Sequence, residues 1–164
     1  MSLEAAREHL SKYGFADRIR LTELSSATVE LAAKAVGADP DEIAKTLSFL
    51  VQGQPVLILA SGLARIDNRK FKDTFHTKAK MIPGDQVEAL VGHAPGGVCP
   101  FGVREGTAVY LDVSLKKHEI VYPAVGTGSS AVPLRIPELE LCAEPRGWVD
   151  VCKEAAPAER GPEA

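Results

Sequence analysis

The sequence predicts a single α/β domain with a mixed β-sheet, and three observations lead to this. Helical segments with their own start and stop residues are interleaved with short aliphatic or β-branched runs. Two of these runs, 46–51 and 56–60, are joined by Gln52-Gly53-Gln54, which is typical of a hairpin. The regular βαβ alternation and the G-x-G-x-x-G turn of a dinucleotide-binding domain are missing. With 164 residues, 45% of them hydrophobic, the chain can bury a core without disulfides or metal.

The first two helices are predicted from the residues at their ends. Ser2 is expected to cap a helix that ends before Gly14. A second helix is expected over 28–36, and it ends at Gly37. Both glycines stand where a helix needs a residue that can adopt a left-handed conformation.

The clearest helix start in the chain lies at Asp39-Pro40-Asp41-Glu42. Asp39 serves as N-cap, Pro40 occupies the first helical position, and Glu42 can close a capping box. The short helix is expected to end near Lys45, where an apolar strand begins. At such a junction the Lys45 ammonium either reaches solvent or points into a pocket, as a cation for a carbonyl or a phosphate.

The second half of the chain shows the same mixture of elements. The pattern at 85–88 predicts a capping box and a helix that ends at Gly92. Further strands are expected at 107–113, 119–124 and 131–136, and a short helix at 137–141. We expect one domain over 1–152 and a flexible acidic tail over 153–164, where Ala, Pro, Glu and Gly dominate.

Composition excludes several classes of protein. Cys99, Cys142 and Cys152 are odd in number and lack C-x-x-C spacing, so neither a disulfide framework nor a metal site is expected. No apolar run approaches the roughly 20 residues of a membrane span, so no membrane partner is expected. The first residues lack a signal-peptide pattern, and a reducing cytoplasm fits best.

The net charge of −3 conceals a basic segment at 65–80. Asp67 can cap a helix there, and six basic side chains stand against two acids. The segment is either a solvated helix face or a contact for a short polyanion. A protein that binds long duplex DNA would usually be basic overall, so DNA is not an expected partner.

Two glycine-rich segments, 96–102 and 126–130, are candidates for ligand loops. Glycine lets backbone N–H groups approach a ligand, and Pro100 stiffens the first loop. Either segment could instead be a turn. Neither is a P-loop, because no G-K-[ST] follows.

Taken together, these motifs resemble those of the YbaK/ProX family. The matching strings are Thr28-Val29-Glu30-Leu31-Ala32-Ala33, Gly37, Ile43-Ala44-Lys45-Thr46-Leu47-Ser48-Phe49, the G-x-x-x-P loop Gly96-Gly97-Val98-Cys99-Pro100 and the turn Gly126-Thr127-Gly128-Ser129. This family comprises aminoacyl-tRNA editing domains similar to the insertion domain of bacterial prolyl-tRNA synthetase. The resemblance runs from about residue 20 to residue 152.

The resemblance implies a mixed, barrel-like sheet surrounded by helices, and hydrolysis of the ester that joins a wrong amino acid to tRNA. It places the catalytic lysine at Lys45 and requires no cofactor. Expected partners are mischarged tRNA and an aminoacyl-tRNA synthetase, with tRNA contacts at Arg65, Arg69, Lys70 and Lys72. The substrate-binding residues that it implies are Thr28, Phe49, Gly96, Gly97, Val98, Cys99, Pro100, Phe101, Gly102, Gly126, Thr127, Gly128 and Ser129.

Hydrolysis of an aminoacyl ester requires few catalytic groups from the protein. An aminoacyl ester is already activated, so an enzyme need only place water and stabilise an oxyanion. His76, His93 and His118 fall in unrelated segments, which favours help from the ribose 2′-hydroxyl of the terminal adenosine. Lys45 could bind the phosphate, the carbonyl or both.

Other functions stay open at this point. Cys99 could act as a covalent nucleophile, but a pocket-lining role that shapes substrate choice is more typical of such a residue. The whole domain could be a non-catalytic module that binds aminoacyl or nucleotide ligands and regulates a partner. A redox protein that uses Cys99 would need a second cysteine nearby in the sequence.

Overall fold

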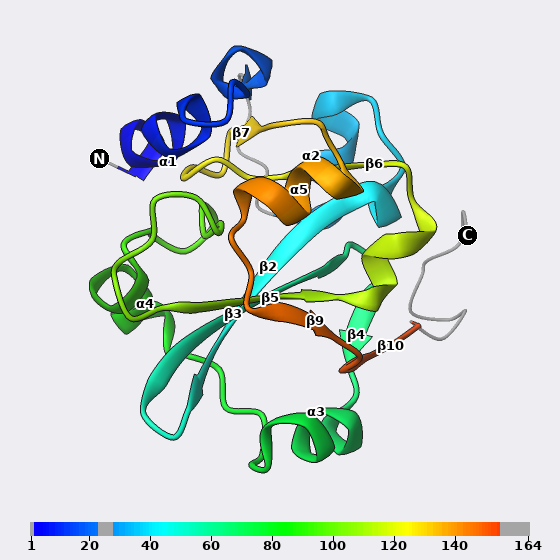
Figure 1. The fold of residues 1–164 in the computed structure, drawn as a ribbon. Helices are drawn as coiled ribbons and strands as arrows, with labels where there is room; N and C mark the ends of the chain where they lie inside the picture. The colour runs from blue at the N-terminus through cyan, green and yellow to red at the C-terminus, as the bar shows by residue number, and fades with distance from the viewer. Residues whose placement is uncertain (1, 23–27, 155–164) are drawn as a thin grey trace.

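A curled mixed sheet in the order β8-β6-β2-β3-β5-β9 forms the centre of the protein (Figure 1). The computed structural model describes residues 2–22 and 28–154. β2 and β3 form the predicted antiparallel hairpin, while β6 runs parallel to β2 and β5 runs parallel to β3. The mixed sheet is therefore confirmed. Its strands are β2 (Ile43–Val51), β3 (Gln54–Ser61), β5 (Ala108–Asp112), β6 (Ile120–Pro123), β8 (Leu134–Arg135) and β9 (Gly147–Val149).

Two short antiparallel pairs lie outside the main sheet. β1 (Arg20–Leu21) pairs with β7 (Ser130–Ala131), and β4 (Ala64–Ile66) pairs with β10 (Cys152–Glu154). β10 extends two residues past 152, the end of the domain predicted from composition. The remainder of the predicted tail, 155–164, lies outside the described residues.

The helices confirm most of the sequence signals. The Thr28 hydroxyl accepts from Leu31 N at the start of α2, Gly37 ends that helix at φ 73°, and the Asp67 carboxylate caps α3. The helices are α1 (Ser2–Ser11), α2 (Val29–Val36), α3 (Asn68–Phe75), α4 (Gly84–Val91) and α5 (Ile136–Cys142), with 3-10 turns at Ala16–Arg18, Pro40–Glu42 and Val113–Lys117.

Three local predictions are wrong. Ser2 lies inside α1, and its hydroxyl donates to Gly92 O rather than capping the helix. α4 begins at Gly84 with Pro83 as its N-cap, two residues before the start expected from a cap at Asp85, and it has no side-chain cap. The strand expected at 131–136 is divided into β7 and β8, because Pro133 has no N–H to donate to a ladder.

The helix predicted to end near Lys45 is also shorter than expected. The capping box of Asp39 and Glu42 forms, but it starts a 3-10 turn of three residues, Pro40–Glu42. Ile43 already belongs to β2, where it pairs with Tyr122 of β6. Tertiary pairing to a distant strand therefore overrides the local helical signal, and Lys45 lies within a strand rather than at a junction.

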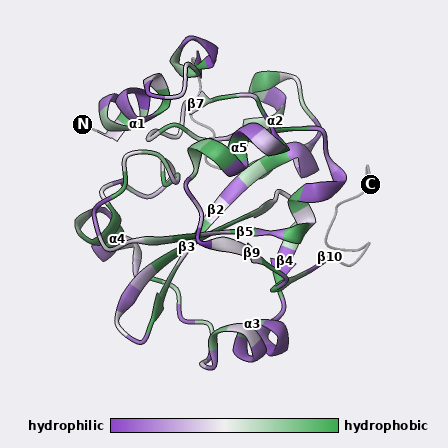
Figure 2. Cartoon of the chain, in the orientation of Figure 1, coloured by the Kyte–Doolittle hydropathy of each residue, from purple (hydrophilic) through white to green (hydrophobic). Residues whose placement is uncertain are grey.

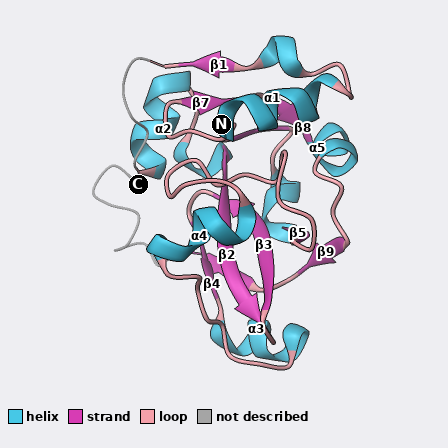
Figure 3. Ribbon diagram, turned by 90° about the vertical axis from the view of Figure 1, so that its left-hand side faces the viewer, coloured by secondary structure: helices cyan, strands magenta, loops and turns pink. Residues whose placement is uncertain are grey.

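The two faces of the sheet carry separate cores. Ala6 of α1, Val91 of α4 and Leu139 of α5 pack on the face that carries Leu57 and Leu59. Phe71 of α3 packs on the opposite face, with Phe49 and Ile58. In Figure 2 the central strands are mostly hydrophobic and α3 is largely hydrophilic. Figure 3 shows α3 at one end of the molecule and α1 and α2 at the other.

The turn between β3 and β4 is held against the 3-10 turn that precedes β2. A Cβ atom on Gly62 would lie 2.0 Å from Pro40 O and 2.7 Å from Val29 Cγ1, so only glycine fits there. Gly62 N also donates to Asp41 O. This contact fixes the turn beside the first residues of β2.

Replacing Gly62 by Ala is expected to lower the free energy of unfolding by about 1–3 kcal/mol, because the backbone must shift to admit the methyl group. Gly147→Ala is the matched control, since nothing lies within 4 Å of its Cβ position; its effect should stay within about 0.5 kcal/mol. Urea denaturation measures both. Equal stability of the two variants would contradict the close contact.

Candidate functional site

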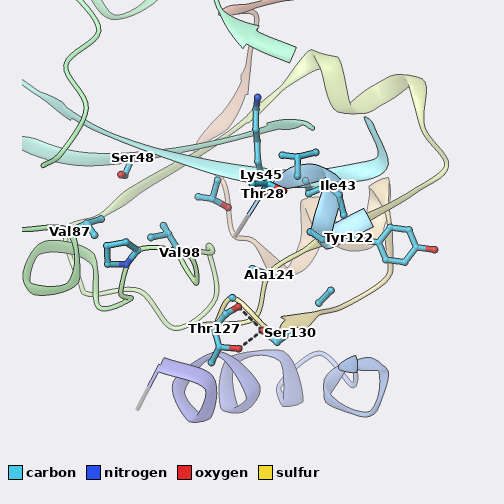
Figure 4. A pocket seen from close by; sticks show the side chains of 18 of the residues that line it. Thr28, Ile43, Lys45, Ser48, Val87, Val98, Tyr122, Ala124, Thr127 and Ser130 are labelled. Carbon is cyan, nitrogen blue, oxygen red and sulfur yellow. Dashed lines mark hydrogen bonds between the residues drawn. The ribbon is translucent and has the colours of Figure 1, made fainter. Parts of the chain in front are cut away.

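A cavity of about 480 Å³ opens beside β2. Its wall comes from α2, β2, residues 81–87, and the two glycine-rich segments (Figure 4). Small-ligand sites typically enclose roughly 300–1,000 Å³, so the cavity is large enough for an aminoacyl group and part of a nucleoside. Apart from Lys45, the described residues that line it are uncharged, and several of them carry hydroxyl groups: Thr28, Thr46, Ser48, Tyr122, Thr127 and Ser130.

Lys45 stands at the edge of this cavity, and its ammonium points away from the glycine-rich loops (Figure 4). The ammonium donates to Gly62 O, in the turn between β3 and β4, at 3.2 Å, and also to Ala64 O, at the start of β4. Burial lowers the pKa of Lys45. The ammonium is therefore neither freely solvated nor directed toward the glycine-rich loops, because two backbone carbonyls hold it at the edge of the cavity.

Asp41 lies close to Lys45 and stabilises the same turn. Its carboxylate accepts hydrogen bonds from Leu63 N at 3.0 Å and from Lys117 Nζ and His118 Nε2, both at 2.8 Å. Burial alone would raise the pKa of Asp41, but the hydrogen bonds from Lys117, His118 and Leu63 lower it to about 2. The sequence analysis missed this cluster, because Lys117 and His118 lie more than 70 residues from Asp41.

The glycines of the two loops serve mainly to bring backbones together. A Cβ atom on Gly97 would lie 2.4 Å from Gly126 O, and one on Gly126 would lie 2.5 Å from the Ser2 carbonyl group. A Cβ atom on Gly102 would lie 2.7 Å from the Ala5 carbonyl group. The loops therefore pack on one another and on α1. Gly96 and Gly128, in contrast, line the cavity.

Cys99, within the first glycine-rich loop, is fully buried beside His93. His93 Nε2 lies 2.7 Å from Phe101 O and 3.5 Å from Cys99 Sγ. Burial raises the pKa of Cys99 to about 12 and lowers the pKa of His93. Both effects favour a neutral thiol and a neutral imidazole, which disfavours a thiolate nucleophile. The sequence analysis separated His93 from Cys99; the fold brings them into contact.

Residues 24–141 match the family described as "Aminoacyl-tRNA editing domain". The chain belongs to this family. The chain is 44% identical over 155 residues to YwhH of Bacillus subtilis strain 168, an uncharacterized protein, and the match covers 94% of this chain and 99% of YwhH. It is 30% identical over 90 residues to the proline–tRNA ligase of Nitratidesulfovibrio vulgaris strain Hildenborough, which covers 54% of this chain and 16% of the ligase.

The fold of this editing domain is also known from a solved structure. A proposed trans-editing enzyme for prolyl tRNA synthetase superposes with a TM-score of 0.83 at 28% identity, over 93% of this chain and 97% of that chain. The curled mixed sheet, with its surrounding helices, is common to both. The fold implied by the sequence resemblance is therefore confirmed.

Only some of the residues that the resemblance implies as substrate-binding line the cavity. Those on the cavity wall are Thr28, Gly96, Val98, Thr127 and Gly128. The others do not line the cavity: Phe49, Gly97, Cys99, Pro100, Phe101, Gly102, Gly126 and Ser129. Phe49 packs on Phe71, on the α3 side of the sheet. The sequence analysis did not assign substrate contact to Thr46, Ser48, Tyr122 and Ser130, which also line the cavity. For Thr46 and Ser48, period-two alternation along β2 was the available signal.

The basic segment of the editing domain lies on α3 and β4. Arg65, Arg69 and Lys72 are exposed. Lys70 instead donates to Asp150 at 3.1 Å and to Cys152 O at 3.0 Å, so it holds α3 against the C-terminal strand. Among the described residues no helix is long and apolar enough to cross a membrane, and no group of three His, Cys, Asp or Glu side chains is placed to hold a metal ion.

The depressed pKa of Asp41 predicts an acid-sensitive contribution to stability. Because the pKa falls from 3.8 to about 2 on folding, the ionised group stabilises the fold above pH 4, by about 2 kcal/mol. This contribution should be lost as the pH falls from about 4 to about 2. Urea denaturation across this range should show a shallower pH dependence for Asp41→Asn than for the wild type.

The exposed Asp73→Asn provides a matched control for this experiment. It removes a carboxylate from α3 without touching the Asp41 cluster. Its pH dependence should follow the wild type. Identical slopes for wild type and Asp41→Asn would contradict the assignment.

Proposed function

We propose that this chain is a free-standing aminoacyl-tRNA deacylase, which hydrolyses the ester bond of mischarged tRNA. Membership of the editing-domain family supports an editing role. The chain matches YwhH and the proposed trans-editing enzyme over nearly their whole lengths, but only 16% of the proline–tRNA ligase. This pattern supports an editing domain that acts in trans.

The observation that carries the proposal is the cavity between β2 and the two glycine-rich loops. Within a chain of the editing-domain family, it joins Lys45 to residues from both loops, Gly96 and Gly128. We assign substrate contact to Thr28, Gly96, Val98, Thr127 and Gly128, which line it. Of the eight remaining residues of the expected set, seven belong to these loops and would hold them in place, whereas Phe49 packs on the α3 side of the sheet.

The reaction in this cavity would be addition of water to the ester carbonyl, followed by loss of the ribose hydroxyl as leaving group. An ammonium has three donors, and two of those on Lys45 are bound to Gly62 O and Ala64 O. The third would serve the phosphate or the carbonyl of the substrate. The ribose 2′-hydroxyl of the terminal adenosine would order the attacking water.

Mischarged tRNA would reach this site with its acceptor stem along the basic segment. Arg65, Arg69 and Lys72 supply exposed positive charge for the backbone phosphates. Lys70 is less suited, because its ammonium is already bound to Asp150 and Cys152. Binding through such contacts should weaken as salt is added.

The direct test of the proposed activity is a panel of mischarged tRNAs incubated with the purified protein. Release of the amino acid is measured against spontaneous hydrolysis and against correctly charged tRNAs. Catalysed release from at least one mischarged tRNA supports the proposal. Tight binding without release from any of them would instead support the non-catalytic regulatory module.

Replacing Lys45 by Ala should reduce deacylation by at least about a hundredfold, the usual cost of removing one donor to a developing oxyanion. Lys45→Arg should restore only part of the activity, because a planar guanidinium cannot reproduce a point charge in a tight site. Lys34→Ala, on the exposed side of α2, is the control and should retain full activity. A folded Lys45→Ala protein with wild-type activity would remove Lys45 from the mechanism.

Neutralising Arg69 and Lys72 together should raise KM for mischarged tRNA and flatten its salt dependence. Hydrolysis of a minimal aminoacyl-adenosine ester should be unchanged, because that substrate lacks the stem. Neutralising Arg7 and Lys34, which are also exposed, is the matched control. Equal damage to both substrates would show that the basic segment supports the cavity rather than the stem.

A further inference from the structure

The edge of β2 that faces away from β3 is covered at both ends but not between them. β6 pairs with this edge only at Ile43 and Ala44. Met81 forms an isolated antiparallel bridge farther along, at Phe49. Between these two points, in the described part of the chain, no strand pairs with β2.

The backbone of Thr46 faces this gap. In an antiparallel pair, alternate residues direct both N–H and C=O to the partner strand, and the residues between them direct both groups away. Ile82 N donates to Ser48 O at 3.1 Å and Leu50 N donates to Lys80 O at 2.9 Å, so Ser48 and Leu50 direct theirs away from β3. Thr46 lies two residues before Ser48, and the ladder between β2 and β3 continues without a break through both, so their backbone groups have the same direction. Its N–H and C=O therefore point into the gap.

The gap and the cavity are one space. Thr46 and Ser48 line the cavity, as do Ile82 on one side of the gap and Ala124, next after β6, on the other. The Thr46 hydroxyl oxygen is buried and has no hydrogen-bond partner among the described residues. Polar recognition along this wall is therefore available from the main chain of β2.

We propose that Thr46 binds the main chain of the aminoacyl group, as if that group were one residue of an added β-strand. An α-aminoacyl ester carries an amino N–H and a carbonyl oxygen on either side of one α-carbon, as a peptide residue does. Thr46 N–H donates to the acyl carbonyl oxygen, and Thr46 C=O accepts from the α-amino group, as in a hydrogen-bonded antiparallel pair.

This binding mode has a consequence for substrate choice. Both bonds involve atoms that every aminoacyl-tRNA shares, so β2 would recognise the α-aminoacyl class and the rest of the cavity would select the side chain. The donated N–H would also polarise the ester carbonyl for attack by water. The inference rests on the proposed function, because it concerns the substrate of the same site.

The test uses the intact protein and a non-hydrolysable probe, 3′-alanylamino-3′-deoxyadenosine. On saturation, the amide resonance of Thr46 should move downfield and its hydrogen exchange should slow by about tenfold or more, as expected for one new hydrogen bond. The Leu47 amide, which points to β3, is the internal control and should not change. A propionyl analogue, which lacks the α-amino group, should bind about tenfold more weakly.

A second experiment removes the backbone N–H donor of Thr46. Thr46→Pro deletes an N–H that makes no ladder bond to β3, and proline is compatible with such an edge position. We expect kcat/KM for an alanyl-adenosine ester to fall by about a hundredfold or more. If Thr46→Pro does not fold, the resonance experiment decides by itself.

The outcomes separate the binding mode from the activity. A Thr46 amide that stays unchanged in the saturated complex, or a folded Thr46→Pro protein with activity within threefold of wild type, overturns the binding mode. If the wild type hydrolyses mischarged tRNA in either case, the deacylase proposal stands. A shifted Thr46 amide in a protein that hydrolyses no mischarged tRNA supports the binding mode and refutes the deacylase.

Discussion

The site depends on one constraint, the incomplete pairing of β2. This strand forms a full ladder with β3 on one edge, but on the other edge β6 accompanies it for only two residues. A strand that is covered on both edges has no free backbone groups and leaves no space for a ligand. Because β6 turns away after Pro123, the cavity opens between β2 and the loops at 95–98 and 127–131.

The surrounding contacts keep this arrangement rigid. Asp41 binds the turn after β3 through Leu63 N. Lys45 binds the carbonyl of Gly62 in the same turn and that of Ala64 at the start of β4. The two glycine-rich loops pack on each other and on α1 without intervening side chains. A buried carboxylate is costly unless it is paired, and His118 and Lys117 supply the pairing here. Packing and electrostatics therefore hold both walls of the cavity in place.

The sequence predicts those features that short-range chemistry determines. The caps at Thr28, Asp39 and Asp67, and the hairpin at Gly53, follow from local hydrogen bonds and from backbone conformations that few residues adopt. The resemblance to the editing family implies, in addition, that Lys45 and both glycine-rich segments belong to one site. What it cannot predict is which of those residues face the cavity, because Gly97 and Gly126 are required for contact between loops rather than for the ligand.

Features that depend on distant partners were missed for the same reason. β4 and β10 are each three residues long and pair with each other across a large separation in sequence, 86 positions at Ile66 and Cys152. The contact between His93 and Cys99, and the Asp41 cluster, exist only once the loops and strands are packed. The short helix expected before Lys45 is only a 3-10 turn, because pairing of Ile43 with β6 outweighs the local capping box.

The most direct test of the account is a crystal structure of the protein with a non-hydrolysable aminoacyl-adenosine analogue. The account predicts that the aminoacyl group occupies the cavity between β2 and the loops that carry Gly96 and Gly128, with its carbonyl toward the β2 edge. An analogue bound anywhere else on the molecule, with this cavity empty, would contradict it.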